Sequence, residues 1–479
     1  MNYFIPGNLD LDTLIQTHPP SQIDKFNLNH LIYILHLLVS IPASNKDLEI
    51  EDGYIPINAQ LLQRYVKNYR QYLDYLIFNG IVFSNNSYTK GKKSIGYKYT
   101  ELYSKTIQKV AIIDKRFLKS IKHNPSIPLY QRKRYDHLLG WYNESLQIDS
   151  QQATEYLLVD LLRKLAYNKE VNTEAPNRQR DPYLQYNCSI VRIEKILSGT
   201  YSLSVDGTVG RLHSAITNMN SQLRNYLTYS NKDLVSVDIK NSQPYLSILL
   251  LNPQFWDSTV NGSLITLKKI ALSRRQLSYY TYIYSSFISS IYVMLSKKKE
   301  SRIHSEFQRY QDLVQNGQFH EYMQTEIEHR TGKVFTSRRA SKATVFQILF
   351  TDNRFIGQIE AQPKRIFKEL FPSVYEVFSL VKKKDKADLP RLLQRIESYL
   401  LLDVITRRIS KDRSDLPIFT IHDSIVTTVG NERYVRQIMQ EELMKAIGTL
   451  PQLAFEYWLP ENVKFSDGTV YLPKNSKAA

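Results

Sequence analysis

Two β-favouring runs that each lead into an aspartate constrain the fold of this chain more than any other feature of its sequence. The first run, Leu234–Val237, leads into Asp238 and is followed by polar residues and Pro244, which opens a predicted helix. The second, 418–429, is broken by His422-Asp423-Ser424, the pattern of a hairpin with a carboxylate at its tip. An Asp at a strand end is well placed to bind a divalent cation, although singly each is more typical of a turn or a helix cap.

The length and charge of the chain indicate the kind of partner that it binds. Its 479 residues predict about two to four folded units. Lys and Arg number 63 against 46 Asp and Glu, and the resulting formal charge of +17 predicts a polyanionic partner. The 34 tyrosines suit both cores and surfaces on which bases stack. A transcription factor, a nuclease, a polymerase and a ribosome-associated protein are all compatible with this composition.

Cysteine usage and the first residues indicate a reducing compartment. Cys188 is the only cysteine, which excludes an intrachain disulfide framework and a cysteine-cluster zinc site. The N-terminal residues lack the basic and apolar regions of a secretory signal, and the most apolar stretch, 31–42, is too short to span a bilayer. We therefore expect a cytoplasmic monomer with no membrane partner.

The N-terminal part, residues 1–105, has the pattern of a small nucleic-acid-binding module. An apolar run over 28–40 and apolar residues at three- and four-residue spacings over 61–76 predict helices. Two β-favouring runs joined by turn residues then predict a hairpin. The tip of this hairpin carries Lys90, Lys92 and Lys93. This order is typical of a winged helix-turn-helix, in which the wing contacts phosphates. A helical cap with a solvated lysine loop fits almost equally well.

The next part, residues 106–200, is polar and basic, with helical patches such as 154–167. It includes a charged loop with a proline over 168–182. We expect a helical thumb-like or linker region here, which leads into the more informative half of the chain.

A stripe of cations and rings follows in the C-terminal half. Arg338, Lys342, Phe346 and Phe350 are four residues apart, so a helix places them along one slowly winding stripe. Charge at one end and rings at the other suit a nucleoside triphosphate, because cations bind phosphates and rings stack on a base. An amphipathic helix with a basic solvent edge is the plainer interpretation.

A flexible turn at Asp206–Ser214 precedes the first Asp-bearing strand and contains Arg211 after Gly210. Glycine allows close approach of the backbone, and the planar guanidinium suits a phosphate. Alone this pattern is weak, since Gly-Arg pairs occur in many ordinary turns.

Taken together and in this order, the segments resemble the motifs of the family A DNA polymerases and of the related phage-type single-subunit RNA polymerases. The resemblance covers roughly residues 195–460. Thr208–Ser214 resembles the motif with Gly-Arg before the palm, Asp238 matches the metal-binding Asp of motif A, and His422-Asp423 matches motif C. Arg338–Phe350 resembles the fingers helix, and His320 loosely resembles the histidine that precedes it.

The resemblance implies an α+β fold with the right-hand layout of palm, fingers and thumb-like helices, in which residues 201–479 form the palm and fingers. It implies two Mg²⁺ or Mn²⁺ ions held by Asp238 and Asp423, with a carbonyl near Ile239 as a further ligand. Five residues would bind the nucleotide, with Lys342 also acting as a proton donor: Gln243, Arg338, Lys342, Phe346 and Phe350. By the same resemblance, Arg211 and His422 would contact a DNA or RNA primer-template.

Departures from the family pattern bear on the choice of sugar. Gln243 occupies the position at which the DNA enzymes have a Glu that closes the space near the 2′ position and the RNA enzymes have Gly. Phe350 lacks the hydroxyl of the RNA enzymes' tyrosine, and both changes favour deoxynucleotides. Gln347 and Thr351 replace two glycines, and Ser424 follows Asp423 as in the RNA enzymes.

The resulting prediction is a template-directed DNA polymerase without a proofreading exonuclease, for which the chain before the palm is too short. An origin in a phage, plasmid or other mobile element is compatible with this prediction. A single-subunit RNA polymerase or primase-like enzyme is the first alternative. A non-catalytic DNA-binding replication initiator or regulator is the second, although it would leave Asp238 and Asp423 without a role. A degenerate polymerase-like scaffold remains open as well.

Overall fold

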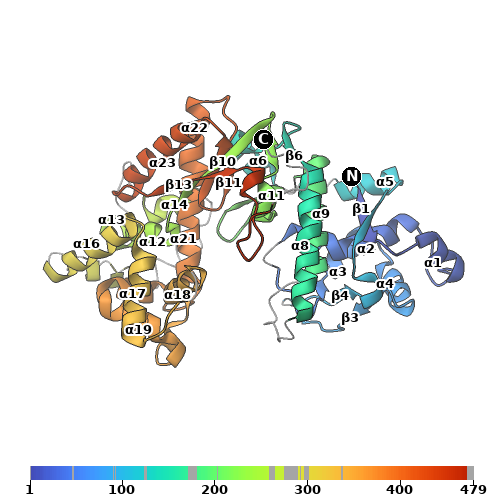
Figure 1. The fold of residues 1–479 in the computed structure, drawn as a ribbon, viewed down its shortest axis with the longest axis horizontal. Coiled ribbons are helices and arrows are strands. Elements are labelled where there is room, and N and C mark those ends of the chain that lie inside the picture. The colour runs from blue at the N-terminus through green and yellow to red at the C-terminus, as the bar shows by residue number, and fades with distance from the viewer. Residues whose placement is uncertain are drawn as a thin grey trace.

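The computed structural model shows a mixture of helices and antiparallel sheets (Figure 1). It describes residues 2–471 apart from 46–47, 90, 92, 123–126, 171–180, 202, 258–264, 274–287, 289, 292, 296–300 and 336–337. In this described part, no helix combines the length and the apolar character that crossing a membrane requires.

The N-terminal elements form a core of their own. They are β1 (Tyr3–Pro6), α1 (Leu11–Thr17), α2 (Leu28–Ser44), β2 (Ile55–Pro56), α3 (Ala59–Tyr65), α4 (Tyr69–Phe78), β3 (Val82–Ser84), β4 (Gly96–Tyr99), β5 (Ile107–Val110) and α5 (Lys115–Lys122). The strands β2, β4 and β3 pair in that order, and β1 pairs with β5. Because Ile112 and Phe117 are buried in the same cluster, this core does not end at residue 105.

The helical period over 61–76 belongs to two helices instead of one. Val66 is fully buried and continues the apolar pattern between α3 and α4. The Asn58 side chain accepts from the Gln60 and Leu61 amides, so α3 has its own N-terminal cap. Lys67 and Asn68 form the turn, and the Tyr69 amide donates to the Val66 carbonyl at 3.1 Å. The sequence therefore shows most of the buried face but hides the break, and Leu61, which opens the pattern, is exposed.

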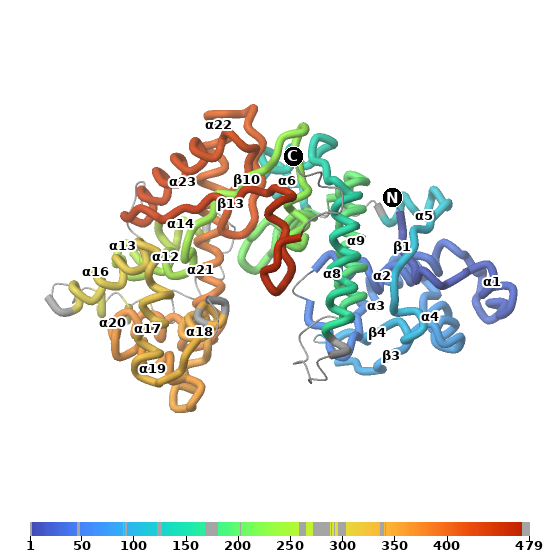
Figure 2. The backbone as a smooth tube through the Cα atoms, in the orientation of Figure 1, coloured from blue at the N-terminus to red at the C-terminus, as the bar shows by residue number. Residues whose placement is uncertain are grey.

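Two long helices, α8 (Ser150–Glu170) and α9 (Pro182–Leu197), lie side by side between the N-terminal elements and the rest of the chain (Figures 1 and 2). Arg192 of α9 is buried and donates to the carbonyl oxygens of Ala43 and Pro42, at 2.8 and 3.3 Å. Lys195 Nζ donates to Ser44 Oγ at 2.7 Å. Two cations of α9 therefore bind the C-terminal end of α2.

The sheet that carries both aspartates lies on the other side of α8 and α9. Its strands are β6 (Leu146–Ile148), β9 (Leu227–Tyr229), β10 (Lys232–Ile239), β11 (Phe419–Ile421), β12 (Ser424–Thr428) and β13 (Leu453–Trp458). They pair antiparallel in the order β11-β12-β10-β9-β6, and β13 pairs with the other edge of β10. The hairpin predicted over 418–429 is confirmed, with His422 and Asp423 as its turn.

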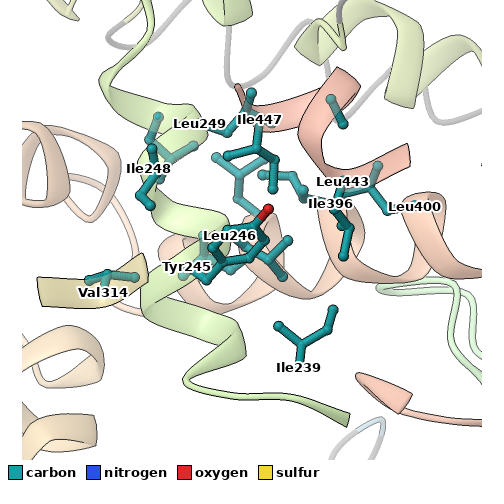
Figure 3. Close-up of a cluster of buried hydrophobic side chains, with 14 of the residues drawn as sticks. Ile239, Tyr245, Leu246, Ile248, Leu249, Val314, Ile396, Leu400, Leu443 and Ile447 are labelled. Atoms are coloured by element: carbon teal, nitrogen blue, oxygen red, sulfur yellow. The ribbon is translucent and has the colours of Figure 1, made fainter. Parts of the chain in front are cut away.

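One face of this sheet is covered by α12 (Ser242–Ser247), α21 (Asp388–Tyr399) and α23 (Glu432–Ile447), and the close-up in Figure 3 shows their contact. Ile239 of β10, Tyr245 and Leu246 of α12, Ile396 of α21 and Leu443 of α23 are buried together there. Because side chains alternate along a strand, burying Ile239 on this face turns Asp238 to the opposite one.

The predicted helix at 338–350 is confirmed as α18 (Arg338–Phe350). It packs against α17 (Phe319–Thr331), α19 (Gln362–Leu370) and α21, while α16 (Ser301–Gln315) and α20 (Pro372–Val381) complete this group. Shorter helices, turns and strands join these parts: η1 (Glu101–Tyr103), α6 (Leu129–Arg134), α7 (Asp136–Leu139), β7 (Ser204–Val205), β8 (Leu212–His213), α10 (Ala215–Asn218), α11 (Ser221–Arg224), η2 (Ile248–Leu251), α13 (Pro253–Trp256), α14 (Leu267–Ser273), η4 (Asn353–Phe355), η5 (Ile359–Ala361), η6 (Leu400–Ile405), α22 (Thr406–Asp412) and η7 (Pro460–Asn462).

Candidate active site

Asp238 lies near the end of β10, beside the turn of the β11–β12 hairpin. It is paired with Ser424 of β12 on one side and with Ala454 of β13 on the other, so the three side chains share one face of the sheet. The Ser236 hydroxyl donates to Asp238 Oδ1 at 3.0 Å. The side chain is half-buried.

Asp423 lies in the two-residue turn between Ile421 and Ser424. The preceding His422 has φ of 52°, in the left-handed region that few non-glycine residues occupy. The Ile239 amide donates to the Asp423 carbonyl oxygen at 3.4 Å, which holds the turn against the end of β10. The strand register therefore brings together the two aspartates that the sequence singled out.

The charges around Asp238 disfavour its ionised form. Burial raises the pKa of Asp238 to about 6, the hydrogen bond from Ser236 lowers it, and the negative charges of Glu456 and Asp423 raise it further. Two carboxylates that repel each other at a half-open strand end fit a divalent cation, which would relieve that repulsion. Within the described residues, no group of three or more His, Cys, Asp and Glu side chains is arranged to hold a metal. Backbone carbonyl, water or substrate oxygens would have to complete the coordination.

A buried carboxylate that the sequence did not single out, Glu397 of α21, connects two of the predicted residues. Its side chain is 1% exposed. Arg211 Nε donates to Glu397 Oε1 at 2.8 Å, and Gln243 Nε2 donates to Glu397 Oε2 at 2.8 Å. Burial raises the pKa of Glu397 to about 7, Arg211 lowers it, and the charge of Asp423 raises it. The available signal was a Glu at helical spacing from Leu393 and Leu400, both apolar, because a carboxylate on an apolar helix face needs a partner.

Some of the buried polar atoms without a hydrogen-bond partner in the described part of the chain belong to residues that follow Asp238 closely in the sequence or interact with its charge. They include Arg224 Nε, Asn241 Nδ2 and Gln243 Oε1. Asn241 also has φ of 53°. Burial lowers the pKa of Arg224, while the charges of Glu456 and Asp238 raise it, so this guanidinium lies within electrostatic reach of the site. Unsatisfied buried groups and backbone in the left-handed region are both often found at functional sites.

The predicted stripe is present on α18 where its side chains are described. Lys342 is exposed, and its Nζ lies 5.9 Å from the centre of the Phe346 ring. The rings of Phe346 and Phe350 are stacked, with centroids 5.6 Å apart, and the His320 ring lies 6.4 Å from Phe346. The side chain of Arg338 lies outside the described residues. Gln243 binds α21 and Phe350 stacks on Phe346, so the two side chains predicted to meet at the sugar have separate partners.

The residues predicted to bind nucleic acid are distributed over distant parts of the chain. Lys93 forms an ion pair with Glu51 at 2.6 Å in the N-terminal module, whereas Lys90 and Lys92 lie outside the described residues. Arg211 is held by Glu397, and its side chain is 19% exposed. His422 is half-buried in the hairpin turn.

Comparisons with known proteins give a weak structural similarity and no family. No protein-family model matches the chain, and no curated protein matches it. A solved structure, the POL domain of Pol1 from M. smegmatis in complex with DNA primer-template and dNTP, aligns with 68% of this chain and 70% of its own, at 13% identity. The TM-score is 0.29, which is too low to establish a shared fold.

Proposed function

We propose that the chain is a template-directed nucleotidyltransferase that extends a DNA primer with deoxynucleoside triphosphates. The observation that carries this proposal is that Asp238, at the end of β10, lies beside the turn that contains Asp423: Asp238 is paired with Ser424, the next residue, and the Ile239 amide donates to the Asp423 carbonyl oxygen. The stripe of Lys342, Phe346 and Phe350 on α18 supports it, because it offers a cation and two rings.

The reaction would join the primer 3′-hydroxyl oxygen to the α-phosphorus of a nucleotide and release pyrophosphate. Asp238 and Asp423, with the Ile239 carbonyl, would hold Mg²⁺ or Mn²⁺, which would polarise the attacking hydroxyl and neutralise charge on the triphosphate. Lys342 would bind the phosphates and donate a proton to the leaving pyrophosphate. Phe346 and Phe350 would stack against the base. Arg211 and His422 would contact the primer-template.

One observation favours a second candidate, an RNA polymerase or primase-like enzyme. Glu397 accepts the amide hydrogen of Gln243, which leaves the Gln243 carbonyl oxygen without a partner in the described structure. If Gln243 lies at the sugar, as its position after Asp238 implies, this oxygen is an acceptor for a 2′-hydroxyl. The same side chain that was expected to exclude a ribonucleotide would then offer it a hydrogen bond.

Primer extension distinguishes these candidates. The protein is given a primed DNA template with dNTPs or rNTPs, in Mg²⁺ or Mn²⁺. Asp238→Asn and Asp423→Asn should each lower incorporation at least about a hundredfold, because each removes a charge from the site. Asp233→Asn, an exposed carboxylate on the same strand, is the matched control. Mg²⁺ should also raise the Tm of the wild type but not of Asp238→Asn.

Two outcomes would contradict the proposal. Extension by either aspartate variant at nearly the wild-type rate would remove the assigned site. A wild type that extends with rNTPs in preference to dNTPs would replace the DNA polymerase by the second candidate.

The N-terminal elements also support a nucleic-acid-binding role. The order α2, β2, α3, α4, β3, β4, with β4 between β2 and β3, is the order of a winged helix-turn-helix. We propose that α4 and the loop between β3 and β4 contact the template duplex, which would hold it near the sheet on the other side of α8 and α9.

A further inference from the structure

The C-terminal end of α18 is bound by two buried lysines from neighbouring helices. Lys364 of α19 is 2% exposed, and Lys382, which follows α20, is 4% exposed. Lys382 Nζ donates to the carbonyl oxygens of Leu349 and Thr351, at 2.8 and 3.4 Å. Lys364 Nζ also donates to the Thr351 carbonyl oxygen, at 2.9 Å.

The second lysine also binds the chain that leaves the helix. Lys364 Nζ donates to the Asp352 carbonyl oxygen and to Asn353 Oδ1, both at 3.0 Å. The two ammonium groups together therefore make five hydrogen bonds to residues 349–353. The last carbonyls of a helix lack donors within the helix and carry its negative dipole end, so cations satisfy both needs.

Burying two ammonium groups at the end of α18 costs more free energy than an ordinary helix C-terminus does. Burial lowers the pKa of Lys382 to about 7, the nearby charge of Lys364 lowers it further, and Asp352 opposes both effects. Burial also lowers the pKa of Lys364. The neighbouring helix α17 ends with Gly332 at φ of 69°, which needs no buried charge. The two buried ammonium groups therefore indicate that the position of the last turn of α18 is fixed at an energetic cost.

The fixed turn is the one that carries the stacked rings. Phe350 is the last residue of α18 and stands between Leu349 and Thr351, whose carbonyls the lysines hold. Its ring stacks on Phe346 one turn earlier. Figure 1 shows α18 beside α17 and α19, the helix that carries Lys364.

We propose that Lys364 and Lys382 are positioning residues, which fix the last turn of α18 so that Phe346 and Phe350 are held ready to stack on the base of a nucleoside triphosphate. The nucleotide part of this proposal rests on the proposed function, whereas the anchoring of α18 does not. Neither lysine is assigned a contact with the nucleotide.

The test replaces each lysine by methionine, which keeps an unbranched side chain and removes the ammonium group. Lys383→Met, next to Lys382 in the sequence but exposed, is the matched control. Hydrogen exchange of the amides at 347–353 reports on the anchor without any need for activity. Binding of a fluorescent dNTP and the KM and kcat of primer extension report on the nucleotide. Circular dichroism at the assay temperature verifies that each variant is folded.

Lys364→Met and Lys382→Met should speed exchange at 347–353 at least about tenfold, since each removes charge-assisted hydrogen bonds. They should also raise the Kd and KM for dNTP about tenfold and leave kcat within about threefold, because no catalytic group is changed. Lys383→Met should change none of these. A global unfolding effect would instead speed exchange throughout the chain.

If the amide hydrogens at 347–353 exchange at an unchanged rate in the variants, the lysines do not fix the last turn of α18. Faster exchange with an unchanged Kd and KM for dNTP would overturn the positioning role and leave the lysines as structural groups. A wild type that binds no nucleotide and extends no primer would overturn the proposed function and the nucleotide part of this proposal, while the exchange measurement would still decide the anchor.

Discussion

Glu397 shows how much one buried carboxylate can organise around the two aspartates. It accepts hydrogen bonds from Arg211 and Gln243, and the guanidinium of Arg211 opposes the unfavourable effects of burial and of the Asp423 charge on the Glu397 carboxylate. Removing one partner of such a group leaves a buried charge or an unpaired donor, which costs more than the net value of the contact. The side chains of Arg211 and Gln243 therefore depend on Glu397 for their orientation.

Exchanging the acid and the amide tests this dependence. Gln243→Glu replaces the donor with a second buried carboxylate, and we expect it to lower the free energy of unfolding by about 2–4 kcal/mol. Adding Glu397→Gln restores a donor opposite an acceptor, so the double variant should recover most of the loss. Urea unfolding of the wild type, both single variants and the double variant measures the coupling. If the double variant is no more stable than the sum of the two single effects predicts, the hydrogen bond between Gln243 and Glu397 does not contribute to stability.

The raised pKa of Asp238 predicts a pH dependence of stability. A carboxyl whose pKa is about 6 in the folded state binds its proton more tightly than in the unfolded chain, where the pKa is 3.8. The free energy of unfolding should therefore fall by about 1–3 kcal/mol as the pH rises from about 4 to about 6. Asp238→Asn should lack this part of the decrease, while Asp233→Asn retains it. The free energy of unfolding is measured by chemical denaturation at each pH. If its pH dependence is the same in the wild type and in Asp238→Asn, the pKa of Asp238 is not raised in the folded state.

At this site, the positions of residues that belong to a local sequence pattern could be predicted. The contacts of residues whose partners are distant in the sequence could not. Asp238 and Asp423 each follow a β-favouring run, so their places at a strand end and a turn follow from neighbours in the sequence. The partners of Glu397 lie 186 and 154 residues away along the chain. No short-range pattern contains that contact, because α21 reaches Arg211 and Gln243 only after the sheet and its helices have packed.

At the scale of elements, periodicity predicted secondary structure and tertiary contacts set its limits. The four-residue spacing from Arg338 to Phe350 predicted a helix, and α18 begins and ends at these two residues. The apolar pattern across Val66 predicted one helix where α3 and α4 are separate. How α9 joins α2 was not predictable, since Arg192 looks like an ordinary surface cation in the sequence. In the structure it is 7% exposed and binds two carbonyl oxygens of α2.

Removing that cation should loosen the attachment of α2 to α9. Arg192→Met keeps an apolar stem but leaves the carbonyls of Ala43 and Pro42 without their donor, and we expect a loss of about 1–3 kcal/mol in the free energy of unfolding. Arg413→Met, just after α22, removes an exposed ion pair with Asp415 and should cost less than about 1 kcal/mol. Equal effects of the two substitutions in urea unfolding would show that the Arg192 contact contributes no more than a surface pair.

At the scale of the whole molecule, the positive charge is unevenly distributed within the N-terminal elements. Residues 1–105 contain ten Lys and Arg against nine Asp and Glu, whereas 106–122, which complete the same buried core, contain five against one. Net charge alone would therefore not attract residues 1–105 to DNA. Binding there would depend on where individual cations lie, such as Arg70, exposed on α4, and Lys93, in the loop between β3 and β4.

The salt dependence of template binding measures whether those cations contact phosphates. Each phosphate contact releases counterions and contributes about 0.9 to the slope of log K against log salt concentration. Replacing Lys67, Arg70 and Lys93 together by Ala should lower that slope by about two to three if all three bind duplex DNA. Lys105→Ala, an exposed lysine just before β5, should leave it within about 0.3 of the wild type. Point substitutions are preferable to deleting the module, because deletion would expose Arg192 and the buried face of α9. An unchanged slope in the triple variant would mean that the N-terminal elements are a cap, and that phosphate binding belongs to the rest of the chain, where most of the positive charge lies.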